Sequence, residues 1–226
     1  MKNLKFTLLS ALILIVFTAS LRAEFLYVSY GKGLLSFSIN RETGALSKLP
    51  GTPTVFPEGI GAITLDHTGK LLYASIGSSI HGYRIEGNGQ LIPLPGSPYR
   101  VSGGGLAVDP FNRFLYATDF GAYPNYSGSV AVYRIQPNGS LAPVPGSPFV
   151  AGIGTAQLAV DPFGRFVYIV NYVGRNTSVF KVLENGTLRP VPGSPFPASL
   201  SFGSPSDLDN VVAESTFTIS RITIHD

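Results

Sequence analysis

The sequence contains no cysteine and no tryptophan, only one methionine, and few charged residues. The lack of cysteine excludes disulfides, thiol nucleophiles, zinc-thiolate sites and iron-sulfur clusters. Charged residues make up 13% of the chain. A soluble domain averages roughly 25%, so neither an acidic disordered tail nor a coiled coil fits. The three histidines, His67, His81 and His225, have no ligand spacing, so we expect no metal and no cofactor.

Residues 1–23 have the order of a secretory signal peptide. Lys2 and Lys5 precede an apolar stretch over 6–19, and small and polar residues then lead to Ala23. A bilayer span takes about 20 residues, so this stretch is short for one, and an uncleaved anchor is the alternative. We therefore expect a chain that begins near Glu24 and is periplasmic or secreted. An exported protein without cysteine suits a bacterial route.

Charge argues against a nucleic-acid partner. Without the three cations of residues 1–23, the chain has 13 Lys and Arg against 13 Asp and Glu. Nucleic-acid binding needs a clustered basic surface, and the remaining cations are scattered singly along the sequence. We therefore expect a small molecule, or a protein or other component of the cell envelope, as the partner.

Three motifs recur in a fixed order through four units. The first is a Pro-Gly phrase whose leading prolines are 45, 50 and 47 residues apart: Pro50, Pro95, Pro145 and Pro192. The second begins with an aspartate and ends with a tyrosine, as in DPFNRFLY at 109–116 and DPFGRFVY at 161–168. The third is an Asn-Gly turn at 88–89, 138–139 and 185–186. This regularity predicts a repeat architecture.

Each unit has the pattern of strands. The apolar run 105–108 ends at Asp109-Pro110, which favours a turn, and the β-prone run 114–118 follows. Residues 129–135 alternate, and Asn138-Gly139 supplies the positive φ of a tight hairpin turn. Each unit is therefore predicted to be a four-stranded antiparallel meander, whose proline-containing fourth strand lies at an outer edge.

Tandem four-stranded units of this length predict an all-β fold of β-propeller blades. The units resemble those of the YVTN-type, lactonase-like (6-phosphogluconolactonase-like) seven-bladed propellers. The segments LYVSYG, LYASIG, LYATDF and VYIVNY stand where that family has its Tyr-Val-Thr-Asn strand, and GSLAPVPGSPF matches its blade-ending phrase. We expect a repeat domain over 24–203 and a non-repeat tail over 204–226.

Only four units are visible where the resemblance implies seven. The first unit begins at its second strand with 25–27, so its innermost strand would have to come from elsewhere, and the alternating stretch 216–224 is a candidate. An open four-blade arc from a truncated or frameshifted gene is favoured over a closed four-bladed ring. An open arc would expose strand edges and a blade face, which invites self-association.

Candidate site residues are few. Lys70, Arg113 and Arg165 recur in register and could attract an anionic ligand at one rim of the channel, although the favoured interpretation is that they are solvated residues of the same turn. Glu58 and Arg100 are the charged residues of two connections between units, and are the candidates for catalysis. The aspartates that recur at 66, 109 and 161 are interpreted as turn residues.

The sequence leaves three functions open, of which we favour the first. The first is an exported binding or scaffold module. The second, implied by the resemblance, is a cofactor-independent hydrolase of sugar lactones. The third is an inactive fragment of such a propeller. The repeated residues are those of strands and turns, and propellers host many unrelated functions.

Overall fold

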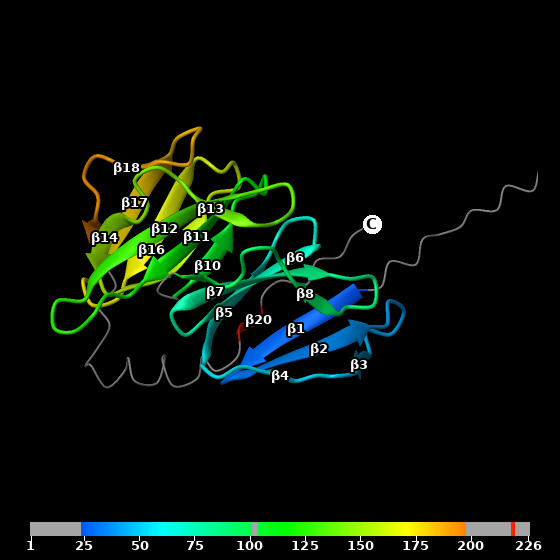
Figure 1. The fold of residues 1–226 in the computed structure, drawn as a ribbon. Helices are drawn as coiled ribbons and strands as arrows, with labels where there is room; N and C mark the ends of the chain where they lie inside the picture. The colour runs from blue at the N-terminus through cyan, green and yellow to red at the C-terminus, as the bar shows by residue number, and fades with distance from the viewer. Residues whose placement is uncertain (1–23, 101–103, 198–217, 220–226) are drawn as a thin grey trace, which may run out of the picture.

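The structure, a computed structural model, describes residues 24–100, 104–197 and 218–219 (Figure 1). All regular structure within these ranges is β-strand, in four antiparallel sheets that we number as blades 1 to 4 along the chain. None of these residues forms a helix with the length and hydropathy of a membrane span. The predicted all-β class is confirmed. The expected signal peptide lies outside the described residues.

Each blade contains three main strands and a divided outer strand. Blade 1 contains β20 (Thr218–Ile219), β1 (Glu24–Tyr30), β2 (Gly33–Ile39), β3 (Leu46–Lys48) and β4 (Thr54–Val55). Blade 2 contains β5 (Ile60–Leu65), β6 (Leu71–Ile76), β7 (Ser79–Ile85), β8 (Leu91–Pro93) and β9 (Tyr99–Arg100). Blade 3 contains β10 (Leu106–Val108), β11 (Phe114–Asp119), β12 (Ser127–Ile135), β13 (Leu141–Pro143) and β14 (Phe149–Ile153). Blade 4 contains β15 (Thr155–Val160), β16 (Phe166–Asn171), β17 (Asn176–Val182), β18 (Leu188–Pro190) and β19 (Phe196–Pro197).

The Pro-Gly phrase divides the outer strand. In blade 3, β13 and β14 both pair with β12, and the phrase at 144–148 lies between them. The hydroxyl of Ser147 accepts a hydrogen bond of 2.9 Å from the N–H of Val132, which satisfies the donor that the break would leave unpaired. Ser97, Ser194 and Thr52 accept equivalent bonds in the other blades. The fourth strand is thus at the outer edge, as predicted, but in two pieces.

The recurrent aspartates organise the turn between the first and second strands of blades 2 to 4. One carboxylate oxygen of Asp66 accepts the N–H groups of Lys70 and Leu71, both at 2.8 Å. Asp161 accepts the N–H groups of Arg165 and Phe166 in the same way. Burial raises the pKa of Asp161, but these N–H groups and the Arg165 guanidinium outweigh it, so that the pKa is lowered. The interpretation of the aspartates as turn residues is confirmed.

The core lies between the blades. Three buried apolar clusters join blade 1 to blade 2, blade 2 to blade 3, and blade 3 to blade 4. The repeated tyrosines cross two of these interfaces: the Tyr27 hydroxyl donates to the Gly89 carbonyl and the Tyr73 hydroxyl to the Gly139 carbonyl, each at 2.8 Å. Tyr116 is fully buried in the third interface, where its hydroxyl has no hydrogen-bond partner among the described residues.

The innermost strand of blade 1 comes from the C-terminal part of the chain. β20 pairs antiparallel with β1, with Ile219 opposite Val28 and Thr218 opposite Ser29. The expected origin of this strand is confirmed for 218–219, while the rest of 216–224 lies outside the described residues. The four blades follow one another in chain order and form a partial propeller (Figure 1).

Candidate functional site

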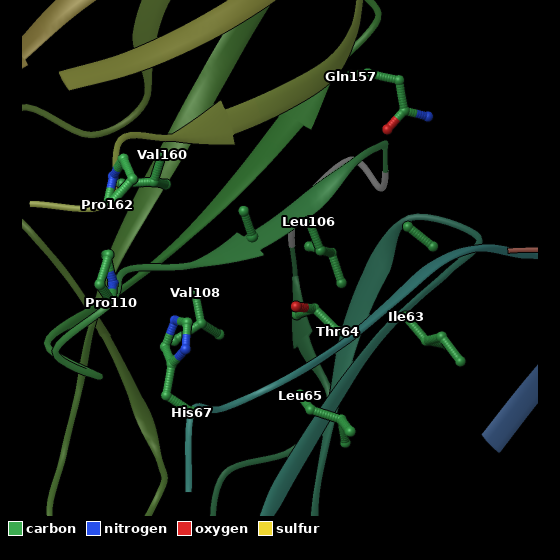
Figure 2. A pocket seen from close by; sticks show the side chains of 12 residues that line it. Ile63, Thr64, Leu65, His67, Leu106, Val108, Pro110, Gln157, Val160 and Pro162 are labelled. Atoms are coloured by element: carbon green, nitrogen blue, oxygen red, sulfur yellow. The ribbon is translucent and has the colours of Figure 1, made fainter. Parts of the chain in front are cut away.

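A cavity of about 590 Å³ lies where the innermost strands of blades 2, 3 and 4 meet. β5, β10 and β15 are neighbours in space and supply most of its lining. Figure 2 shows apolar side chains from these strands around the cavity, including Ile63, Leu106 and Val160. In a propeller, the innermost strands line the central channel, so this is the channel side of the molecule.

Three polar side chains interrupt the apolar lining. Thr64 comes from β5, Gln157 from β15 and His67 from the turn after β5. In Figure 2, His67 and Gln157 lie at opposite ends of the cavity. The His67 backbone is fixed to blade 3, because its N–H donates to the Asn112 side-chain oxygen at 2.8 Å. No Asp, Glu, Lys or Arg is among the described residues that line the cavity.

Sequence reasoning did not select Thr64 and Gln157, although the repeat register carries a signal for both. Gln157 stands four residues before the repeated aspartate, where the other units have Ala62 and Gly105. Thr64 stands two residues before it, where the other units have alanine. A polar side chain at a position that is otherwise small and apolar marks a local departure from the repeat.

The two candidates for catalysis both adjoin the turn between β6 and β7. Glu58 lies so close to Gly77 that a Cβ there would be 1.2 Å from its Oε2. Arg100 pairs across the sheet with Ser79. His81 lies on the same strand, with its Nε2 3.1 Å from the Ser79 hydroxyl. Burial lowers the pKa of His81, and the Glu58 carboxylate opposes that shift.

The three candidate anion ligands are not all together. Arg113 and Arg165, with Lys181, line a shallow cavity of about 380 Å³ in which Lys70 takes no part. The Arg113 Nε lies 2.7 Å from a carboxylate oxygen of Asp109, and its counterpart Arg165 pairs with its own turn aspartate at 3.1 Å. Each guanidinium also lies over phenylalanine rings of its own turn. Both arginines therefore stabilise the turns, and an anion would have to compete with the aspartates.

No group of three or more His, Cys, Asp or Glu side chains within the described ranges is placed to hold a metal ion. The polar cluster next to the β6–β7 turn contains one imidazole and one nearby carboxylate. Its chemistry is that of proton transfer and hydrogen bonding.

Blades that pack in sequence around a channel-side cavity define a partial β-propeller. The family model of the lactonase, 7-bladed β-propeller matches residues 77–193, which is half of the chain. The chain belongs to the lactonase family of seven-bladed β-propellers.

Solved structures share the fold at low sequence identity. A protein from Bacteroides uniformis, named as a candidate 6-phosphogluconolactonase, is 15% identical with a TM-score of 0.67, over 77% of this chain and 52% of that one. The periplasmic gluconolactonase PpgL of Pseudomonas aeruginosa is 16% identical with a TM-score of 0.63, over 77% and 52%. An auxiliary nutrient binding protein from Bacteroides thetaiotaomicron is 14% identical with a TM-score of 0.50, over 80% and 44%.

This chain spans about half the length of the structures it matches. No curated protein matches the sequence. These likenesses show the fold, and activity is a separate question.

Proposed function

We propose that this protein is an exported binding module of the lactonase propeller family. Its ligand is a small, neutral, polar molecule of the sugar or sugar-lactone class, bound in the cavity between β5, β10 and β15. One observation carries the proposal: the cavity is lined by apolar side chains with three neutral or weakly basic polar groups and without charged side chains among the described residues.

The chemistry of the lining suits such a ligand. Ligand sites are mostly apolar, with a few polar groups that fix the orientation of the ligand. Thr64 and Gln157 offer a hydroxyl and an amide that can both donate and accept hydrogen bonds. The apolar side chains of β5 and β10 can cover the C–H faces of a sugar ring. A phosphorylated sugar fits less well, because no cation lines the described cavity.

Saturation-transfer NMR with glucose and with glucono-1,5-lactone tests this proposal. We expect saturable binding to the full chain, and a loss of about two- to tenfold in affinity in Gln157→Ala, because a lost hydrogen bond costs about 0.5–1.5 kcal/mol. Gln136→Ala, in the turn after β12, is the matched control and should bind as the wild type does. Binding that is unchanged in Gln157→Ala would contradict the assigned cavity.

Lactone hydrolysis is the second candidate, favoured by the placement of Glu58, His81 and Arg100 around one turn. In such a reaction a water molecule attacks the lactone carbonyl carbon and a carboxylate or imidazole accepts its proton. The ring C–O bond then breaks, and the departing ring oxygen takes that proton to become a hydroxyl. A guanidinium would stabilise the oxyanion that develops.

A pH-stat assay with glucono-1,5-lactone distinguishes the enzyme from the binding module. Hydrolysis above the spontaneous rate that is abolished in Glu58→Gln or Arg100→Ala would establish the enzyme. Saturable binding without turnover supports the binding module. A folded chain with neither property would be an inactive fragment, and both proposals would fail.

A further inference from the structure

The two terminal blades each present an apolar face that the inner blades bury. Tyr168 of blade 4 is 42% exposed, whereas its repeat equivalents Tyr73 and Tyr116 are fully buried. Leu46 of blade 1 is 50% exposed, whereas its equivalent Leu141 is 8% exposed. The two faces are on opposite sides of a blade, because Tyr73 packs toward the following blade and Leu141 toward the preceding one.

The interfaces between neighbouring blades show which contacts form when two such faces pack together. A tyrosine of one blade donates its hydroxyl to the carbonyl of the turn glycine in the next, as Tyr73 does to Gly139 at 2.8 Å. That glycine is also required sterically, because a Cβ on Gly139 would be 3.0 Å from Leu71 and Leu94 of the preceding blade. Gly89 is enclosed in the same way by Phe25 and Leu49.

Blade 4 has the donor half of this contact without an acceptor in the described residues. Tyr168 occupies the donor position, and Phe166 and Val191 occupy the positions of Leu71 and Leu94. Val170 and Val179 extend the same face. Val170 is 48% exposed and stands where the other blades have the buried hydroxyls of Ser29, Ser75 and Thr118.

Val170 makes this face more apolar than the equivalent faces of the inner blades. The Ser75 and Thr118 hydroxyls donate to carbonyls at the entry of the following inner strand, Gly104 and Ala156. Val170 has no donor for such a carbonyl, and it adds an exposed apolar side chain to this face instead.

Blade 1 has the acceptor half without a donor in the described residues. Gly44 closes the turn between β2 and β3 with a φ of 70°, and its N–H donates to the Asn40 carbonyl at 2.8 Å. No described residue lies within 4 Å of the place where its Cβ would be. Leu26 and Phe37, at positions that are buried in the other blades, lie half-buried on the same sheet.

We propose that two copies of this chain associate head to tail, with the blade 4 face of one copy packed on the blade 1 face of the next. In this arrangement the Tyr168 hydroxyl of one copy donates to the Gly44 carbonyl of the other, and Phe166 and Val191 enclose Gly44. The contact repeats the interface between neighbouring blades of one chain. It is heterologous, so each copy keeps one unmatched face unless the assembly closes.

Sedimentation velocity of the full chain over a wide concentration range tests the proposal. The wild type should associate reversibly. Val170→Lys should abolish association by placing a charge in the apolar contact. Gly44→Asn should also abolish it, because asparagine tolerates positive φ while its side chain fills the space that the contact needs. Tyr168→Phe should weaken association about two- to tenfold, the effect of one hydrogen bond.

Two controls make the test specific. Gly51→Asn introduces the same residue at a glycine with a φ of 76° and open space around its Cβ, and should associate as the wild type does. An equimolar mixture of Val170→Lys and Gly44→Asn should form a 1:1 dimer, because each variant retains the face that the other has lost. Circular dichroism and thermal unfolding must show that both variants fold.

Three results would overturn the proposal. One is a wild type that stays monomeric at every concentration. Another is association that survives both Val170→Lys and Gly44→Asn. The last is a mixture of these variants that stays monomeric, since a head-to-tail contact requires their complementation.

Discussion

Tyr73 and Tyr116 occupy equivalent positions in two blades, but only the Tyr73 hydroxyl has a hydrogen-bond partner among the described residues. Comparing the two therefore measures how much one buried hydroxyl contributes to stability. Tyr73→Phe removes a buried hydrogen bond to the Gly139 carbonyl and leaves that carbonyl without its partner. We expect a loss of about 1 kcal/mol in the free energy of unfolding. Tyr116→Phe removes a buried hydroxyl that has no described partner, so we expect no loss or a small gain. Urea unfolding of both variants measures the difference.

The contrast between the two tyrosines is the informative quantity, because both substitutions leave the ring in place. Equal losses in the two variants would show that the Tyr116 hydroxyl is satisfied after all, for example by a buried water.

His81 makes stability depend on pH. Burial among Phe56, Ser79 and Tyr83 lowers its pKa in the folded state, and the Glu58 carboxylate offsets part of this. The unfolded chain, in which a histidine has a pKa of about 6.5, therefore binds the proton more readily. The contribution of His81 to the free energy of unfolding is therefore complete above that pH. It decreases as the pH falls from about 6.5 toward the lower pKa of the folded state.

Removing the imidazole should flatten this dependence. Ala131 occupies the equivalent position in blade 3, so His81→Ala is a substitution that a blade accepts. We expect the variant's unfolding free energy to change less between pH 7 and pH 5 than that of the wild type, as measured by urea unfolding at each pH. An unchanged slope would assign the pH dependence to other groups.

At the scale of the element, the serine of the Pro-Gly-Ser-Pro phrase completes the ladder of the third strand. Ser147→Ala leaves the Val132 N–H, which is buried, without an acceptor. We expect a loss of about 1–3 kcal/mol, the cost of an unsatisfied buried donor. Ser147→Thr is the matched control, because Thr52 accepts the equivalent bond in blade 1 at 2.9 Å. Thermal unfolding distinguishes the two. A threonine variant as unstable as the alanine variant would show that packing, and not the hydroxyl, is what matters.

Strand positions and turns could be predicted because they depend on local chemistry. Asp66, Asp109 and Asp161 bond to N–H groups within five residues, so short-range patterns are enough to find their turns. The division of the outer strand was missed because it depends on a contact across 15 residues, between the Ser147 hydroxyl and the third strand.

At the scale of the whole molecule, the number of blades and their order follow from the repeats, but the site does not. Thr64 and Gln157 come together only because neighbouring blades place β5, β10 and β15 side by side. Glu58 and Arg100 were selected separately, as charged residues of two connections, and the fold places both beside the β6–β7 turn. Contacts between residues of different units depend on how the blades pack. The spacing of motifs along the sequence does not predict that packing.

The outer edges and the terminal faces differ in their tendency to associate with other chains. β8, β13 and β18 are three residues long and each ends in proline, so the outer perimeter is a poor template for the addition of foreign strands. Edge pairing is therefore disfavoured at these three strands, whereas the two terminal faces expose apolar side chains such as Tyr168 and Leu46. Any polymer of this protein would grow along one curved line. Its two ends would differ, because one would present a free blade 1 face and the other a free blade 4 face.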